Sequence, residues 1–225
     1  MHLTALLPMK AHSERVPNKN MKTFHGTPLY HAVANTLSAS GYINEVIINT
    51  DSDVIREDAT KHFQKIRIID RPEALLGDFV PMNDIIACDL SQSEATHFLQ
   101  THSTNPILST KSINKAIETY FANLDQYASL FSVTRLQTRL YWKDGSAINH
   151  NPAELLRTQD LPPVYEENSC FYIFSKESFN AAGNKRIGLK PLMFELDKIE
   201  AVDIDEPADF IIAETLYKLS KANEI

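Results

Sequence analysis

The chain has few glycines and few cysteines, and both shortages exclude familiar classes of site. Six glycines occur in 225 residues, and their positions allow neither GxGxxG nor the GxxxxGK[ST] phosphate loop. A P-loop NTPase and a glycine-fingerprint dehydrogenase are therefore excluded. The two cysteines, Cys88 and Cys170, are far apart in the sequence and lie among apolar residues. We expect two reduced core side chains, not a disulfide framework or a zinc site.

Long hydrophobic runs and an excess of basic residues are also missing. No apolar run approaches the roughly 18 residues that a membrane-spanning helix needs. The first ten residues carry no charged n-region before Pro8 and Lys10, so we expect no secretory signal. Lys and Arg number 22 against 29 Asp and Glu, giving a net charge of -7, which argues against a duplex-binding basic surface. We expect a soluble cytoplasmic protein that binds neither nucleic acid nor membranes.

What the sequence does contain is a regular alternation of buried-strand and helix patterns. Apolar runs predict strands at 3–7, 45–49, 66–69, 97–100, 129–134, 170–174 and 199–204. Helices are predicted at 28–40, 53–63, 82–92, 111–122 and 206–221, with Thr27–Pro28 starting the first and Ser52 capping the second. This alternation predicts a single α/β domain over 1–225, with a mostly parallel sheet covered by helices on both faces.

The pattern changes between about 136 and 168, where aromatic and polar residues mix. Asp144–Gly145 is typical of a hairpin turn. Leu140, Tyr141 and Trp142 precede it and would form an exposed aromatic patch of the kind that marks an interface. We expect this block to be an insertion that covers a site or reaches a partner subunit.

Two polar clusters are candidates for chemistry, and the first is the loop after the opening strand. It holds Lys10, Arg15, Lys19 and Lys22 against one acid, Glu14. The loop follows the carboxyl end of a strand, where open α/β sheets bind ligands, and Lys and Arg can clamp phosphoryl oxygens. A solvated basic loop without a ligand is an equally good interpretation of the charges alone.

The second cluster is Asp203 and Asp205, just before the last helix. Alternate residues of a strand share a face, so both carboxylates would project together and favour Mg²⁺, or Mn²⁺, as a counter-ion. A helix-start signal, with Asp205 as N-cap before an acidic first turn, explains Asp205 but not Asp203.

The loop sequence LLPMKAHSERVPNKNM resembles the nucleotide-binding loop of the acylneuraminate cytidylyltransferase family, whose pattern runs roughly I-P-A-R-x-x-S-K-x-x-P-x-K-N. It matches at Pro8, Ser13, Pro17, Lys19 and Asn20. Further matches follow in order: Thr50–Asp51, Arg71–Pro72 with Gly77–Asp78, Gln100 with Ser103 and Pro106, and Asp203-Ile204-Asp205-Glu206-Pro207-Ala208-Asp209-Phe210. Each motif is weak alone, but five in order over nearly the whole chain are specific.

The resemblance implies a Rossmann-like fold of the nucleotide-diphospho-sugar transferase type, acting as a homodimer. It also implies that CMP passes from CTP to the anomeric hydroxyl of a sialic-type nonulosonic acid, with Mg²⁺ present and pyrophosphate released. The implied residues are Lys19, Arg15 and Lys10 for catalysis; Ser13, Lys19, Asn20, Arg71 and Asn83 for the nucleotide; Gln100, Arg157 and Tyr172 for the sugar; and Asp203 and Asp205 for the metal. Tyr172 is equally compatible with a role as a core aromatic.

The chain departs from the family pattern at two loop positions. The family's arginine is Lys10 here, which keeps the charge but loses the bidentate fork. The usual Ser-Lys is Ser13-Glu14, and we expect Arg15 to supply the missing charge. Two alternatives stay open: the same chemistry on a 3-deoxy-octulosonate, and an inactive nucleotide- or sugar-binding module. Against the first alternative, this chain lacks the acidic residue that such enzymes carry after the position of Gln100.

Overall fold

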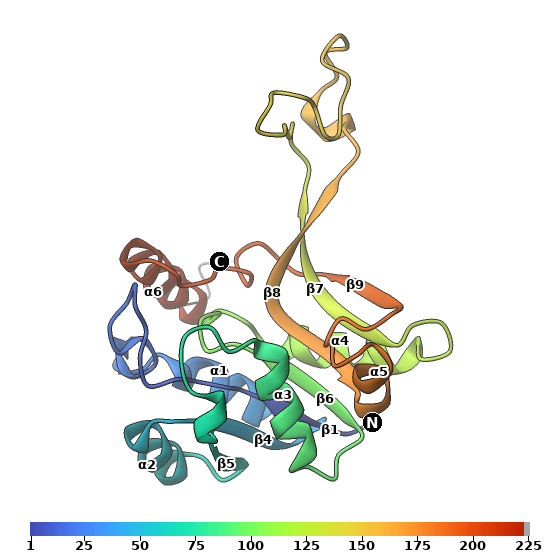
Figure 1. Ribbon diagram of the computed structural model, residues 1–225. Helices are drawn as coiled ribbons and strands as arrows, with labels where there is room; N and C mark the ends of the chain where they lie inside the picture. Colours follow the sequence, from blue (N-terminus) through green and yellow to red (C-terminus); the bar gives the residue numbers. More distant parts are fainter. Residues whose placement is uncertain (223–225) are drawn as a thin grey trace.

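The computed structural model describes residues 1–222, so the last three residues of the predicted domain lie outside it. A seven-stranded sheet forms its centre (Figure 1), in the order β5-β4-β1-β6-β8-β7-β9. The strands are β1 Leu3–Leu6, β4 Ile43–Thr50, β5 Ile66–Asp70, β6 His97–Thr101, β7 Ser129–Leu136, β8 Val164–Ser175 and β9 Pro191–Glu195. Only β8 runs antiparallel to its neighbours, β6 and β7, among these strands of residues 1–222. The predicted mostly parallel sheet is confirmed.

Helices cover both faces of this sheet. They are α1 Tyr30–Ala39, α2 Asp53–His62, α3 Met82–Ser91, α4 Thr110–Ala122, α5 Lys176–Ala181 and α6 Pro207–Lys221. α1, α2 and α4 pack on one face through the larger apolar core, and α3 and α5 pack on the other. α6 lies beside the sheet, where Phe210 joins Val16, Phe24 and Ile204 in a third cluster. Within the described part of the chain, no helix has both the length and the apolarity needed to cross a bilayer.

The start of the first helix is placed later than the sequence predicts. Thr27–Pro28 forms β3, which pairs with β2, Thr23–Phe24, and α1 begins only at Tyr30. The prediction was wrong because Pro28 pairs opposite Thr23 in a hairpin and does not open the helix. The Ser52 cap is confirmed, since its hydroxyl accepts a hydrogen bond from the Ile55 amide. Cys170 is buried as expected, Cys88 is half-buried, and both are free thiols.

The predicted strand at 199–204 is also wrong, and β9 was missed. Residues 197–202 form a turn, with the Ala201 amide bonded to the Asp197 carbonyl at 3.0 Å. Ala201 and Val202 of this segment pack against the apolar clusters without pairing in the sheet, and Ile199 is exposed. The last strand is instead β9, which lies parallel to β7. Asp203 and Asp205 flank the buried Ile204, whose amide bonds to the Thr104 carbonyl at 3.0 Å, and the charges of both aspartates act on Lys19.

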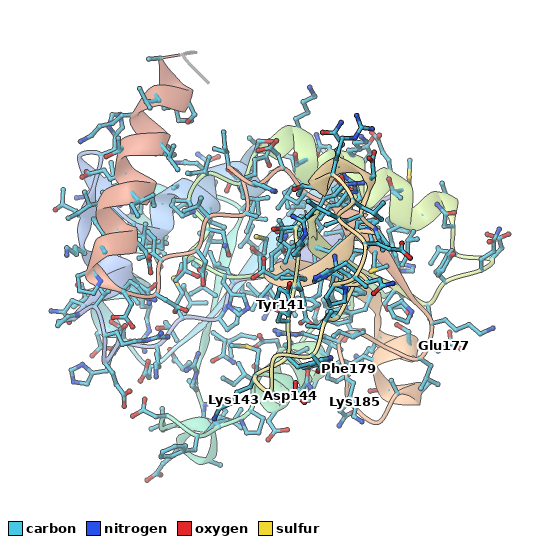
Figure 2. All side chains as sticks on the ribbon, turned by 90° about the horizontal axis from the view of Figure 1, so that it is seen from above. Tyr141, Lys143, Asp144, Glu177, Phe179 and Lys185 are labelled. Atoms are coloured by element: carbon cyan, nitrogen blue, oxygen red, sulfur yellow. The ribbon has the colours of Figure 1, made fainter. Side chains whose placement is uncertain are left out.

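The chain between β7 and β8 extends away from the sheet (Figure 1), and we call residues 137–163 the projecting segment. An isolated bridge pairs Tyr141 with Ala147, and the Gly145 amide bonds to the Trp142 carbonyl at 2.9 Å. The predicted hairpin turn at Asp144–Gly145 is therefore confirmed. Tyr141 and Trp142 are 52% and 63% exposed. Figure 2, seen from above, shows Tyr141 and Asp144 on this segment in front of the sheet.

Candidate active site

The cationic loop and the two aspartates meet near the carboxyl ends of β1 and β6. Lys19 lies in a short 3₁₀ helix, Lys19–Met21, and its Nζ donates a 2.5 Å hydrogen bond to the Ile204 carbonyl oxygen. The same Nζ is 4.0 Å from the Asp205 carboxylate. A loop from the start of the chain thus contacts the segment before its last helix, and a lysine lies between two carboxylates.

The charges and burial at this contact shift the pKa values of Asp203 and Lys19. Burial raises the pKa of Asp203 above its ordinary value, and the neighbouring charge of Asp205 raises it further. Asp203 is exposed as a residue, but its carboxylate lies in crowded surroundings where its charge is poorly solvated. Burial lowers the pKa of Lys19, while the charges of Asp203 and Asp205 oppose that shift. The half-buried Lys19 and the nearby Arg15 thus share these two carboxylates, and carboxylate oxygens of this kind are also the ligands that an oxygen-ligated divalent ion takes.

The other loop cations are held by acidic side chains. Arg15 donates to Asp205 Oδ1 at 2.8 Å and to Glu206 Oε1 at 3.4 Å. Lys10 pairs with Asp78 at 2.6 Å, and that hydrogen bond lowers the pKa of the Asp78 carboxyl. These ion pairs are exposed, so each contributes little to stability and can exchange for a ligand. Ser13 lies half-buried in the same loop.

Asn20 and Arg71, both expected at the nucleotide, use their polar groups inside the protein. The Asn20 amide donates to the Lys10 carbonyl at 3.1 Å and accepts from the Ser103 hydroxyl at 2.6 Å. Arg71 donates to the Met9 and Asn49 carbonyls at 3.2 and 2.9 Å, and to the Asn49 side chain at 2.9 Å. In the structure these two residues hold the loop in shape. Contact with a nucleotide would be additional to these bonds.

A buried acid, Asp89, lies behind this support. Its Oδ1 accepts a hydrogen bond of 2.6 Å from Asn49, while its Oδ2 has no partner within residues 1–222. Burial raises its pKa to about 7, although the Asn49 hydrogen bond and the Arg71 charge act in the opposite direction. Asp89 therefore keeps its proton at pH values at which an ordinary carboxyl has lost it.

We expect Asp89→Asn to flatten the pH dependence of stability. The folded pKa of about 7 lies above the unfolded value, so Asp89 lowers stability as pH rises from about 4 to 7. The free energy of unfolding of the variant, relative to wild type, should thus be higher at pH 8 than at pH 5, by on the order of 2–4 kcal/mol. Urea unfolding at both pH values measures this. Equal differences at the two pH values would contradict it.

A second polar cluster joins Gln100, Tyr172 and Arg186. Gln100 on β6 lies opposite Tyr172 on β8. The Arg186 guanidinium lies 3.8 Å from the centre of the Tyr172 ring, and its Nη1 donates to Gln100 Oε1 at 2.6 Å. Tyr172 is fully buried, and its hydroxyl contacts Glu167 and, at 3.0 Å, Ser169. The Arg186 amide contacts Asn83 Oδ1 at 3.5 Å.

Arg186 was not identified in the sequence, yet it contacts three of the predicted site residues. It lies between α5 and β9, in the stretch AAGNKRIGLK, which carries no periodic pattern. Arg157, the residue expected at the sugar, is placed elsewhere. It lies in the projecting segment, is strongly exposed, and pairs with Asp160 at 2.7 Å. This chain therefore does not itself bring Arg157 to Gln100.

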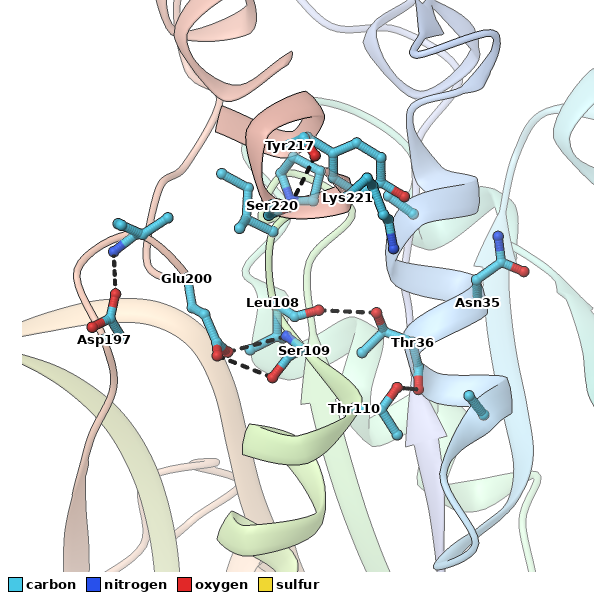
Figure 3. A pocket seen from close by; sticks show the side chains of 15 residues that line it. Asn35, Thr36, Leu108, Ser109, Thr110, Asp197, Glu200, Tyr217, Ser220 and Lys221 are labelled. Carbon is cyan, nitrogen blue, oxygen red and sulfur yellow. Dashed lines mark hydrogen bonds between the residues drawn. The ribbon is translucent and has the colours of Figure 1, made fainter. Parts of the chain in front are cut away.

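A large groove of about 760 Å³ lies between α1, the start of α4 and the end of α6 (Figure 3). Its polar groups are bonded to one another: Glu200 accepts from the Ser109 amide and hydroxyl, both at 3.0 Å, and Thr36 donates to the Leu108 carbonyl. None of the predicted site residues lines it. Its size alone gives no reason to place chemistry there.

Comparison with known proteins gives a consistent result. A family model described as cytidylyltransferase matches residues 4–219. The chain is 26% identical over 232 residues to a pseudaminic acid cytidylyltransferase of Campylobacter jejuni, covering 96% of both chains. It is 27% identical over 238 residues to a CMP-N,N'-diacetyllegionaminic acid synthase of Legionella pneumophila, covering 98% of both. It is 28% identical to N-acylneuraminate cytidylyltransferase A of Danio rerio, covering 95% of this chain and 50% of that protein.

Solved structures show the same fold. A CMP:2-keto-3-deoxy-manno-octonic acid synthetase complexed with CTP superposes with a TM-score of 0.70 at 11% identity, covering 100% of both chains. A 4-diphosphocytidyl-2C-methyl-D-erythritol synthase from Anaerococcus prevotii superposes with a TM-score of 0.67 at 14% identity, covering 96% of both. At these identities the similarity identifies the fold alone, and it agrees with the nucleotide-diphospho-sugar transferase type that the sequence predicts.

Proposed function

This chain belongs to the cytidylyltransferase family, and we propose that it transfers CMP from CTP to the anomeric hydroxyl of a nonulosonic acid, releasing pyrophosphate. The observation that carries this proposal is the contact of Lys19 with the Asp203–Asp205 segment, because it unites a cationic loop and a carboxylate pair in one site. The relatives named above, which act on pseudaminic and legionaminic acids, support the substrate class.

The residues of the site suit this reaction. The sugar hydroxyl oxygen forms a bond to the α-phosphorus, the bond from that phosphorus to the pyrophosphate oxygen breaks, and the hydroxyl proton leaves to solvent. Such transfer needs positioned cations more than a covalent nucleophile. Lys19 is fixed by its hydrogen bond to Ile204, so we assign it to the triphosphate. Arg15 and Lys10 would exchange their carboxylate partners for phosphate oxygens, with Ser13 and the loop amides beside them.

Asp203 and Asp205 fit a magnesium ion, with manganese as the alternative. Both offer carboxylate oxygens whose charges act on Lys19, and the raised pKa of Asp203 reflects a charge that a nearby cation would stabilise. When bound, the ion would neutralise charge on the phosphate oxygens. Arg15 donates to Asp205 Oδ1 alone, so Oδ2 of that carboxylate could take the ion while Arg15 keeps its place or turns to a phosphate oxygen.

We assign the sugar carboxylate to Arg186. This guanidinium is largely enclosed, and burial lowers its pKa, yet within residues 1–222 it forms no ion pair with a carboxylate. Its partners are the Gln100 oxygen and the Tyr172 ring. The Glu167 charge acts on Arg186 without pairing with it, and the carboxylate of a nonulosonic acid would supply a direct ion pair. Gln100 and Tyr172 are both fully buried, and the Gln100 amide donates to the Thr101 carbonyl at 2.8 Å, so both would act on the sugar by orienting Arg186.

Arg186→Ala should therefore raise the KM for the sugar by about 10–100-fold, the range of a charge-assisted hydrogen bond, while the KM for CTP stays unchanged. Arg186→Lys should recover part of the loss, because it keeps the charge without the fork. Lys185→Ala, at the exposed neighbouring position, serves as the control. Steady-state kinetics with each substrate varied in turn would show this. An unaltered sugar KM in Arg186→Ala would refute the assignment.

We also propose that the protein works as a homodimer in which the projecting segment of one subunit reaches the site of the other. The exposed Tyr141 and Trp142 are suited to an interface, and Arg157, remote from Gln100 of its own chain, would then approach the sugar site of the partner. An active species that sediments as a monomer would contradict this proposal.

The activity is tested by incubating the chain with CTP, Mg²⁺ and a panel of sialic, legionaminic and pseudaminic acids and 3-deoxy-octulosonate, and assaying pyrophosphate. We expect release with at least one nonulosonic acid and little with the octulosonate. Release with the octulosonate alone would favour the alternative substrate. CTP binding without pyrophosphate from any sugar would favour an inactive binding module.

A further inference from the structure

Three metal-ligating side chains converge on α1 and α2, outside the site described above. His31 lies in the first turn of α1, and Asp58 and His62 lie one turn apart on α2. His31 Nε2 is 2.5 Å from Asp58 Oδ2, and His62 Nδ1 is 3.1 Å from Asp58 Oδ1. One donor atom from each of the three residues lies within 4.8 Å of the others. Two imidazoles are thus directed at opposite oxygens of one carboxylate.

The surroundings hold this arrangement in place. The Tyr30 hydroxyl donates to Asp58 Oδ2, and the His31 ring packs edge-on against Phe63 with centroids 4.9 Å apart. The His31 and His62 rings are 5.2 Å apart. The side chains of His31 and Asp58 are 9% and 19% exposed, whereas that of His62 is 42% exposed. The cluster is therefore preorganised on its inner side, supported by a hydroxyl bonded to the carboxylate, and open to solvent at His62.

We propose that His31, Asp58 and His62 form a binding site for a Zn²⁺-type transition metal ion, with water completing the coordination on the exposed side. Two imidazole nitrogens and one carboxylate oxygen are the ligand set of a borderline ion, whereas Mg²⁺ and Ca²⁺ prefer oxygen alone. His62 Nδ1 is 2.8 Å from the Asp58 carbonyl oxygen, and it would leave that contact to ligate the metal. The ion would link α1 to α2 and strengthen their packing on the sheet.

A simpler role, a hydrogen-bonded tie between the two helices, accounts for part of the cluster. Burial disfavours the Asp58 charge, but the hydrogen bonds from Tyr30 and His31 outweigh it and lower the pKa of Asp58. The contacts of Tyr30 and His31 with Asp58 are enough to link the two helices. His62 adds nothing to that tie, since among the described residues its Nδ1 contacts only its own helix, at the Asp58 carbonyl and carboxylate, whereas a metal site uses this imidazole as its third ligand.

The test is calorimetric titration of the full chain with ZnCl₂, in excess Mg²⁺ and in an Asp203→Asn, Asp205→Asn background that removes the carboxylate pair of the other site. We expect one saturable Zn²⁺ per chain and a higher Tm with Zn²⁺. His62→Gln and Asp58→Asn should each weaken binding by at least about tenfold. His2 is an exposed histidine elsewhere, and His2→Gln should bind Zn²⁺ with the same affinity as the background protein. Co²⁺ in place of Zn²⁺ should give a visible absorption band that His62→Gln lacks.

His62 is exposed on one side, so His62→Gln should keep its circular dichroism and Tm in the absence of metal. Absence of saturable Zn²⁺ binding, or equal affinity in a folded His62→Gln variant, would overturn the metal site and leave the cluster as a tie between α1 and α2.

Discussion

Lys19→Met lowers kcat by about 10²–10³-fold, the usual cost of removing one preorganised group that stabilises charge in a transition state. Lys19 Nζ is held at the Ile204 carbonyl, 4.0 Å from Asp205, so its charge is already fixed before any nucleotide arrives. Methionine has a similar shape but carries neither charge nor donor. Pyrophosphate release at saturating CTP and sugar measures the effect.

Lys22→Met is the matched control for Lys19. Lys22 lies in the same loop, is exposed, and sits 4.4 Å from the centre of the Phe210 ring. The Lys22→Met variant therefore loses the same charge outside the carboxylate site, and we expect its kcat to change by less than a few-fold. Thermal melting separates catalysis from the loss of the Lys19 contact with Ile204. A Lys19→Met protein with wild-type kcat would remove the observation on which the proposed function rests.

Asp203→Asn should reduce turnover at fixed, low millimolar Mg²⁺ by about 100-fold, and part of this loss should return as Mg²⁺ is raised. The substitution keeps one oxygen but removes the negative charge. In the wild type this charge is disfavoured by burial and repelled by Asp205. Because that repulsion is relieved in the variant, its fold should not be weakened. The Mg²⁺ dependence of initial rates is the measurement.

Asp125→Asn, at an exposed loop position, is the control that removes the same charge elsewhere. It should leave both the rate and the Mg²⁺ dependence as in the wild type. If Asp203→Asn lost no activity at low Mg²⁺, the aspartate pair would not be the metal site.

Much of the fold could be predicted because the buried strands of a parallel sheet are short apolar runs. The run Glu45–Asn49 lies inside β4, and Ser52 caps α2, so a strand and the helix after it follow from local chemistry. The segment before α6 shows the limit of this reasoning. Its apolar residues are as frequent as in a strand, but Ile204 is buried by α6 and the loop, not by a neighbouring strand.

The sequence likewise predicts one part of the candidate site and misses another. The cationic loop and the Asp203–Asp205 pair are contiguous motifs, so the sequence places them within a few residues. Arg186 has no motif. Its importance arises from β8, which runs antiparallel and brings Tyr172 opposite Gln100, so that the loop after α5 covers both. Arg157 was expected at the sugar because the family resemblance places the inserted block beside it, and the sequence does not reveal that this block projects from the sheet.

The strand β8 belongs to two parts of the molecule at once: its first residues continue the projecting segment, and its last residues form the base of the Gln100–Arg186 cluster. Its pairing with β7 is interrupted between Phe131 and Val133, where Ser169 adopts a left-handed φ of 56°. The Ser169 hydroxyl accepts the 3.0 Å hydrogen bond from Tyr172. A β-bulge in the ribbon thus coincides with the polar contact of Tyr172, whose ring lies against the Arg186 guanidinium. The projecting segment and the Gln100–Arg186 cluster are therefore joined through the bulged part of one strand.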